Sequence, residues 1–185
     1  MDTPKKSRRT EELNMLQEIR YRAKIEEAIV NDIPVSVLIW GPSASTIDAI
    51  SSLRIKIRTV LTQRGHLARF SEELVDAESS GDAGSQQLMH GELFDLIVSL
   101  PNTYASIIAI NNFMSDNRLN KKMIIFLDAT IDYGRDFQNL LESSTQRTYG
   151  SAITYKGEGE FGIVEATVYE TVKRIGEIKF LNERI

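Results

Sequence analysis

The 185-residue sequence contains no cysteine and only two histidines, His66 and His90. The lack of cysteine excludes disulfide bonds, a thiolate nucleophile, and zinc or iron–sulfur sites built on cysteine. With two isolated histidines, we predict no metal site. The longest apolar runs, at 35–40 and 123–127, are too short to span a bilayer. The charged N-terminus has no apolar segment typical of a signal peptide. We therefore expect a cytoplasmic protein that does not enter a membrane.

Positive charge is missing from the middle of the chain. Between Phe70 and Asn117 there is no lysine or arginine, although eight acidic residues fall there, and the whole chain has a formal net charge of −4. Such a stretch disfavours DNA or polyphosphate, so nucleic acid is not an expected partner; a solvated face with a loop is the simpler interpretation. In residues 1–24, seven basic residues outnumber four acids. We divide the chain into a basic N-terminal tail and helix, 1–32, and a single α/β domain, 33–185.

Apolar patterning predicts five strands that alternate with helices. Residues 1–10 are expected to be disordered, and a helix should cover 11–30 and end before Pro34. The next helix should be capped by Ser45 or Thr46 and end at the RGH sequence of 64–66. The strands are expected at 35–40, 66–70, 94–100, 121–129 and 150–156, the other helices at 86–93, 104–115, 134–145 and 160–184, and a polar loop at 71–85.

This alternation is typical of a doubly wound α/β fold. We expect a mostly parallel five-stranded sheet with helices on both faces, together with an extra N-terminal helix. Such sheets bind ligands beyond the carboxyl ends of their strands, where the strand order reverses. The segments that leave the strands at that edge are the candidate site, namely residues 40–45, 71–76, 99–106 and 128–134.

The first of these segments combines an aromatic ring with small residues. At a helix N-terminus, Gly41, Pro42 and Ser43 would let backbone amides approach a phosphate or a sugar. A tight turn is the alternative, since the segment is neither a Walker A loop nor G-x-G-x-x-G. Trp40, the only tryptophan, is expected either in the core or stacked on a base.

Polar side chains also follow the second and third strands. Glu72 could accept hydrogen bonds from ribose hydroxyls, with a solvated loop as the alternative. After the third strand, several hydrogen-bonding side chains gather at one strand-to-helix junction, more than a turn alone requires; we take Ser99, Asn102, Thr103, Tyr104 and Ser106 as ligand-binding candidates.

The fourth strand is followed by a weaker candidate group. Asp128, Asp132 and Tyr133 could serve an acid–base role, but the sequence fixes no histidine or second base near them. His66 and His90 stand alone, so no Ser-His-Asp arrangement is predicted.

The order of these pieces resembles TIR domains and the related nucleoside deoxyribosyltransferase-like proteins. The resemblance covers roughly residues 33–180 and rests on GPS after the first strand, RGH, FDLIVSLP, SIIAINNF and MIIFLD. Members often cleave the N-glycosidic bond of NAD or a nucleoside with a glutamate in a Ser-x-x-Glu pattern. Here Ser106 matches the serine, but Ala109 stands at the glutamate position. A methyl group cannot stabilise the oxocarbenium-like transition state.

The resemblance implies a TIR-like nucleotide-processing effector module. It would take NAD or a related nucleotide as substrate or ligand, need no separate cofactor, and assemble as a homo-oligomer or with a partner protein, as in bacterial antiphage defence. Cleavage would require a glutamate at position 109; Ala109 is compatible with a natural binding version, an inactivating substitution or a different register.

The alternative function is a non-catalytic interaction or ligand-binding domain, which would self-associate or dock a partner through its first helix. A phosphoacceptor receiver-like domain is disfavoured, because residues 41–43 (GPS) stand where that function needs an acidic cluster.

Overall fold

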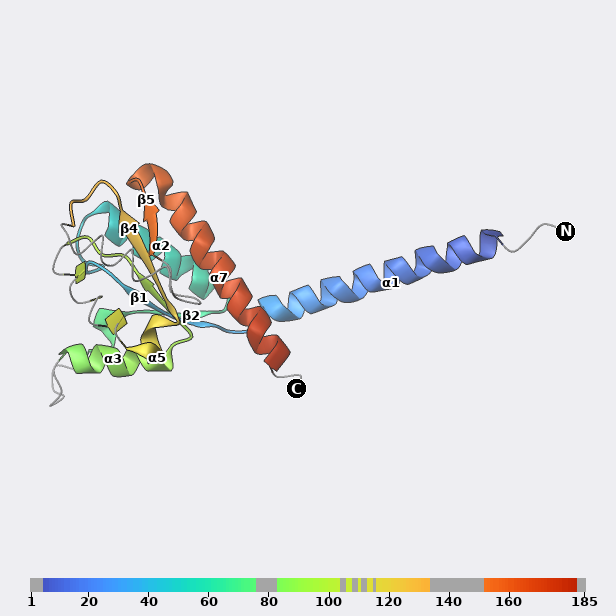
Figure 1. Cartoon of the computed structure of the whole chain (residues 1–185), viewed down its shortest axis with the longest axis horizontal. Helices are drawn as coiled ribbons and strands as arrows, with labels where there is room; N and C mark the ends of the chain where they lie inside the picture. Colours follow the sequence, from blue (N-terminus) through green and yellow to red (C-terminus); the bar gives the residue numbers. More distant parts are fainter. Residues whose placement is uncertain are drawn as a thin grey trace.

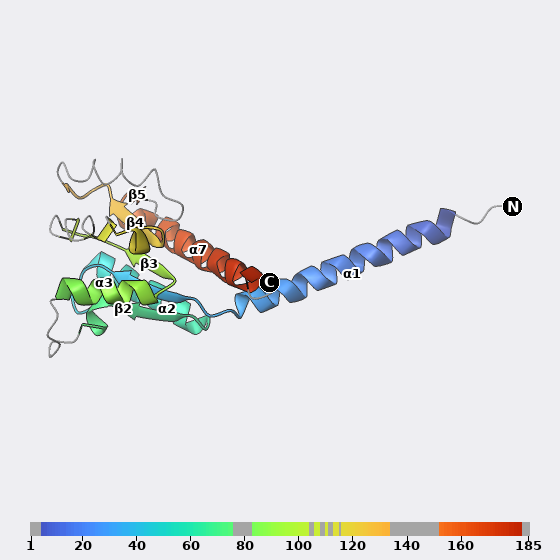
Figure 2. The same cartoon turned by 60° about the horizontal axis from the view of Figure 1, so that its bottom comes forward.

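An N-terminal helix projects from an α/β body in the computed structural model (Figures 1 and 2). This helix, α1 (Lys5–Asn31), begins earlier than the sequence predicts. The expectation of disorder over 1–10 is therefore wrong for residues 5–10, where lysine and arginine favour a helix and neither proline nor glycine interrupts it. The structure describes residues 5–75, 83–103, 106–107, 110, 113–114, 116–133 and 152–182.

Five parallel strands form one sheet, which confirms the predicted doubly wound α/β fold. Their order is β2-β1-β3-β4-β5, so the order reverses between β1 and β3. Each strand lies within its predicted range and is shorter by at most two residues at either end. The strands are β1 (Ser36–Trp40), β2 (Leu67–Phe70), β3 (Leu96–Ser99), β4 (Met123–Asp128) and β5 (Ala152–Tyr155).

Helices cover both faces of this sheet. On one face α2 (Ala49–Gln63) and α7 (Phe161–Asn182) pack their apolar side chains against the strands. The other face is covered by α3 (Ala83–Leu93), α5 (Asn117–Asn120) and the chain around them. These two helices lie together in Figure 1. Because β1, β3 and β4 are buried on both sides, their sequences are continuous apolar runs rather than alternating ones. Among the described residues, no helix is both long and apolar enough to cross a membrane.

Several helix starts differ from the prediction. Asp48 caps α2, accepting from the backbone N–H of Ser51 at 2.7 Å, so Ser45 and Thr46 are not the caps. The predicted loop 71–85 contains a short 3-10 helix, η1 (Ser71–Glu73), and the start of α3. A second 3-10 helix, η2 (Glu158–Glu160), precedes α7. The predicted helix 134–145 lies outside the described residues, as does much of 104–115.

The carboxylate of Asp95 connects several elements at the edge of the sheet where the strands begin. Asp95 Oδ2 accepts hydrogen bonds from Ser36 N at 2.7 Å, Ser36 Oγ at 2.8 Å and Lys179 Nζ at 2.6 Å. The same ammonium of Lys179 donates to the carbonyl of Pro34 at 3.2 Å. Burial alone would raise the pKa of Asp95, but the bonds from Lys179 and Ser36 outweigh it and lower that pKa below its ordinary value. The ionised carboxylate therefore joins β1, the start of β3 and α7.

Replacing Asp95 with asparagine should destabilise the fold at neutral pH and much less in acid. Because the pKa is lower in the folded chain than in the unfolded chain, the carboxylate stabilises the fold above the unfolded-state pKa. That contribution is lost as the pH falls through the folded-state pKa. In urea denaturation, we expect the loss of unfolding free energy in Asp95→Asn to be largest near neutral pH and to shrink below about pH 4.

An exposed carboxylate on α7 provides the control for this measurement. Glu177→Gln should change the unfolding free energy little at either pH, because Glu177 is exposed to solvent. If Asp95→Asn loses the same unfolding free energy in neutral and acid solution, the ionised carboxylate of Asp95 is not what stabilises the fold.

Candidate functional site

A buried arginine organises the loop that follows β1. Arg54 of α2 is completely buried, and its guanidinium donates to the carbonyl of Ile39 at 2.9 Å and to the carbonyl of Pro42. It also donates to both carboxylate oxygens of Glu72, at 3.1 and 2.9 Å, and lies over the ring of Phe70 at 4.6 Å. Arg54 thus holds together the end of β1, the following loop and η1. Arg54 is not among the residues predicted from the sequence, although a cation between Ile50 and Ile57 on an apolar helix face is a usable signal.

Glu72, a predicted ligand contact, has structural partners within the chain. Besides Arg54, its Oε1 accepts from the backbone N–H of Ala44 at 3.2 Å. Burial alone would raise the pKa of Glu72, but the bonds from Arg54 and the backbone lower it. The ionised carboxylate beside the β1–α2 loop disfavours a phosphate there, because it occupies the Ala44 amide and repels a second anion.

The three loop residues predicted to contact a ligand form a tightly bonded turn. A Cβ on Gly41 would lie 2.8 Å from the Leu100 carbonyl oxygen and from Arg54 Cδ, so only glycine fits there. The carbonyl of Ser43 accepts a hydrogen bond from Thr46 N at 2.9 Å. The hydroxyl of Ser43 lies 2.8 Å from the hydroxyl of Ser45. The loop therefore has the tight-turn structure that was the alternative interpretation.

Trp40 and Ser99 meet where the strand order reverses. They are register partners at the carboxyl ends of β1 and β3. The indole of Trp40 is only 6% exposed and packs 4.8 Å from the ring of Phe113, so it belongs to the core. Trp40 Nε1 and Ser99 Oγ are both buried, and neither has a hydrogen-bond partner among the described residues. Unsatisfied buried polar groups are costly, so this edge holds unused hydrogen-bonding capacity.

Two candidates after β3 bond to each other. Ser106 N donates to Thr103 Oγ1 at 3.2 Å, and Thr103 N donates to Ser106 Oγ at 3.1 Å. This reciprocal pattern is that of a helix N-cap. Asn102 is half-buried beside them. Tyr104 and Ala109 lie outside the described residues.

The weaker candidates after β4 also make structural contacts. Asp128 Oδ1 accepts from Thr130 N at 2.9 Å, from Thr130 Oγ1 at 2.7 Å and from Gly157 N at 3.1 Å, which ties the ends of β4 and β5. The hydroxyl of Tyr133 donates to the carbonyl of Pro101 at 2.9 Å. Burial raises the pKa of Tyr133 to about 12, so this phenol is protonated at neutral pH and is no general base there.

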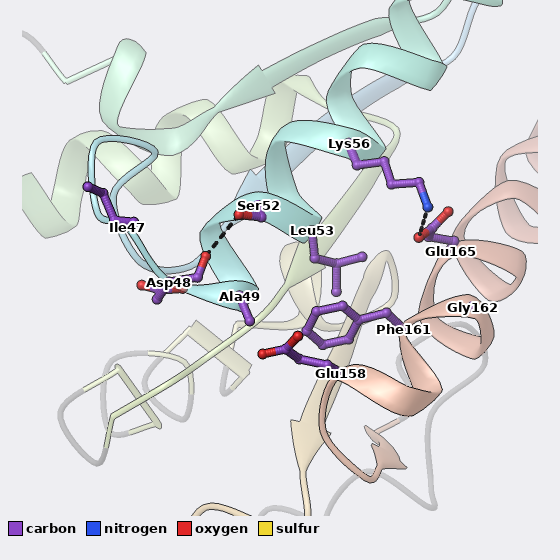
Figure 3. Close-up of a pocket in the computed structure, with 10 residues that line it drawn as sticks. All are labelled: Ile47, Asp48, Ala49, Ser52, Leu53, Lys56, Glu158, Phe161, Gly162 and Glu165. Atoms are coloured by element: carbon purple, nitrogen blue, oxygen red, sulfur yellow. Dashed lines mark hydrogen bonds and ion pairs between the residues drawn. The ribbon is translucent and has the colours of Figure 1, made fainter.

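The α2–α7 pocket opens between the N-terminal parts of these two helices (Figure 3). Its volume of about 720 Å³ is in the range of small-molecule sites. Leu53 and Phe161 face each other across it, and Lys56 Nζ lies 2.7 Å from Glu165 Oε1. The lining consists of Ile47, Asp48, Ala49, Ser52, Leu53, Lys56, Glu158, Phe161, Gly162 and Glu165.

The charge of this lining limits what it can bind. The lining contains three carboxylates, those of Asp48, Glu158 and Glu165, and one lysine, Lys56. The ammonium of Lys56 is already paired with Glu165. The pocket therefore suits a neutral or cationic group better than a phosphate. This pocket could not be predicted from the sequence, because its walls come from segments about a hundred residues apart.

The sequence matches no model of a known protein family and no curated protein. In the part of the chain that the structure describes, no three His, Cys, Asp or Glu residues gather to hold a metal ion.

Proposed function

We propose that this chain is a TIR-like, nucleotide-binding α/β module whose ligand lies beyond the carboxyl ends of β1 and β3. One observation carries the proposal: at the reversal of strand order, the register partners Trp40 and Ser99 each bury an unsatisfied polar group. An indole N–H and a hydroxyl are suitable partners for the carbonyl and ring nitrogens of a base. Doubly wound sheets bind nucleotides at this position.

The surrounding charge favours recognition of the nucleoside part. The arginines nearest the β1–α2 loop are paired, Arg54 with Glu72 at 2.9 Å and Arg58 with Glu73 at 2.6 Å. Residues 71–117 supply no lysine or arginine. We therefore place the base and ribose at the sheet edge and any phosphates toward solvent.

Ligand binding should raise the melting temperature of the unchanged chain. Addition of NAD, or of nicotinamide riboside, stabilises the folded state if it binds only that state. We expect the shift in thermal denaturation to fall in Ser99→Ala, which removes the unpaired hydroxyl. Ser52→Ala in the α2–α7 pocket is the matched control and should keep the shift. If Ser52→Ala abolishes the shift and Ser99→Ala preserves it, the ligand occupies the pocket instead.

Cleavage of the N-glycosidic bond is the activity that the TIR resemblance implies. It requires a carboxylate at position 109, where this chain has alanine. We expect Ala109→Glu to release nicotinamide from NAD and the unchanged chain to release none. Release by the unchanged chain would mean that the catalytic carboxylate lies elsewhere. The same resemblance would make the module a cytoplasmic effector that acts as an oligomer.

A non-catalytic interaction domain is the second candidate. The observation in its favour is the projecting helix α1, whose apolar side chains are exposed. Absence of any thermal shift with nucleotides or nucleosides would favour this function over the first.

A further inference from the structure

Another pocket lies beside the edge of the sheet where the strands begin, and we call it the amino-edge pocket. Its volume of about 400 Å³ is within the range of small-molecule sites. Its walls come from the end of α1 and the residues that follow it, from the end of α2, from the start of β2 and from α7. Figures 1 and 2 show the C-terminal end of α1 beside α7, which it contacts. The fold therefore assembles this pocket from segments that are far apart in the sequence.

Arg64, at the C-terminal end of α2, brings a positive charge to this pocket. Its guanidinium lies 4.7 Å over the ring of Tyr169 on α7. Such stacking uses the flat face of the guanidinium and leaves the N–H groups in its plane able to donate. No group in the described part of the chain accepts a hydrogen bond from this guanidinium or forms an ion pair with it. Arg64 is thus a positioned cation without an anionic partner there.

His66, directly before β2, provides a second donor on the same wall. Its Nδ1 accepts a hydrogen bond from the backbone N–H of Val35 at 3.3 Å, so this nitrogen carries no proton. Burial, together with the charge of the nearby Arg64, lowers the pKa of His66 and keeps the imidazole neutral at neutral pH. The one proton of a neutral imidazole therefore lies on Nε2. This N–H and the guanidinium of Arg64 are neighbouring donors.

The remaining lining gives the pocket a positive balance. Besides Arg64 and the neutral His66, the charged lining residues are one base, Lys173, and one acid, Glu170. Lys173 already has an interaction within the chain, so Arg64 and His66 are the donors that a ligand can use. Much of the other wall is apolar and is formed by Ile33, Leu61 and Val172. This combination suits an anion with an apolar body.

We propose that the amino-edge pocket binds a small organic acid. Its carboxylate accepts hydrogen bonds from the guanidinium of Arg64 and from Nε2–H of His66, and its apolar part lies against Ile33 and Val172. A single negative charge fits better than a phosphate dianion, because the lining carries a net charge of only about +1. The pocket lies at the other edge of the sheet from the proposed nucleotide site, and this inference does not depend on that site.

The small number of histidines makes this binding measurable. His90→Gln leaves His66 as the only imidazole of the chain, so its ring signals in proton NMR report on this pocket. We expect titration with benzoate to shift these signals saturably. Benzamide has a similar shape without the charge. It should bind at least about tenfold more weakly, because hydrogen bonds between charged groups are the stronger ones.

Arginine substitutions distinguish this pocket from other binding positions. In the His90→Gln chain, Arg64→Met should weaken benzoate binding about tenfold or more. Arg69→Met is the matched control, because Arg69 of β2 is exposed and does not line the pocket; it should keep the affinity. Tyr169→Phe retains the ring beneath Arg64 and should also bind. Circular dichroism verifies that each variant folds.

The results that would overturn the proposal are distinct. One is the absence of a saturable shift of the His66 signals with benzoate at millimolar concentration. Another is equal binding of benzamide, and a third is an affinity for benzoate that Arg64→Met leaves unchanged. Benzoate binding without any thermal shift by NAD or nicotinamide riboside would leave this inference standing and remove the proposed function, so the two fail separately.

Discussion

Arg54→Met is expected to lower the free energy of unfolding by about 3 kcal/mol or more, the largest effect of any substitution considered for this chain. The guanidinium is completely buried and bonds to two backbone carbonyls as well as to Glu72. Methionine fills similar space but donates no hydrogen bond, so the carbonyls of Ile39 and Pro42 lose their donor inside the protein. Urea denaturation monitored by circular dichroism measures the loss.

A second arginine on the same helix supplies the matched control. Arg58 also lies 4.6 Å from the Phe70 ring and pairs with a glutamate, Glu73, but both partners are about one-third exposed. Exposed ion pairs contribute little, so Arg58→Met should cost less than about 1 kcal/mol. Equal losses in the two variants would show that burial and carbonyl bonding do not set the importance of Arg54.

Gly41→Ala should be the second most destabilising change, with a loss of about 2–3 kcal/mol. The new methyl group would lie 2.8 Å from the carbonyl oxygen of Leu100 and from Arg54 Cδ. The first of these atoms is backbone at the end of β3, and the second belongs to a side chain fixed by its hydrogen bonds, so neither can move cheaply.

Gly159→Ala is the control for this prediction. Apart from the adjoining backbone, no atom lies within 4 Å of the position that a Cβ on Gly159 would take. We expect the unfolding free energy of this variant to stay within about 0.5 kcal/mol of that of the unchanged chain. A Gly41→Ala variant as stable as Gly159→Ala would mean that the loop relaxes without loss.

Strands β1, β3 and β4 could be predicted from the sequence because burial on both faces produces an unbroken apolar run. In β1 every residue from Val37 to Trp40 is buried, so the pattern identifies the strand without tertiary information. The start of α2 could not be chosen in the same way. Ser45, Thr46 and Asp48 all suit an N-cap, and only the three-dimensional path of the loop selects Asp48.

The sequence could place the candidate segments at one edge of the sheet but could not resolve their contacts. Topology brings the predicted segments together, and Trp40 and Ser99 meet as register partners. The partner of Glu72 could not be identified, since the apolar helix face around Arg54 indicates burial of that arginine but not its pairing with a glutamate 18 positions later. The α2–α7 pocket depends on Asp48 and Glu158, which no local pattern connects.

The connection between α1 and β1 is a fixed joint rather than a flexible tether. Three consecutive residues are held by other parts of the chain: Pro34 through its carbonyl by Lys179, Val35 by His66 and Leu67, and Ser36 by Asp95. Only residues 32–35 separate the helix from the strand. Because Pro34, Val35 and Ser36 are anchored through backbone groups to the sheet and to α7, the axis of α1 has a set direction relative to the strands. A force applied along the helix would therefore reach the sheet directly through β1, the strand next to the edge strand β2.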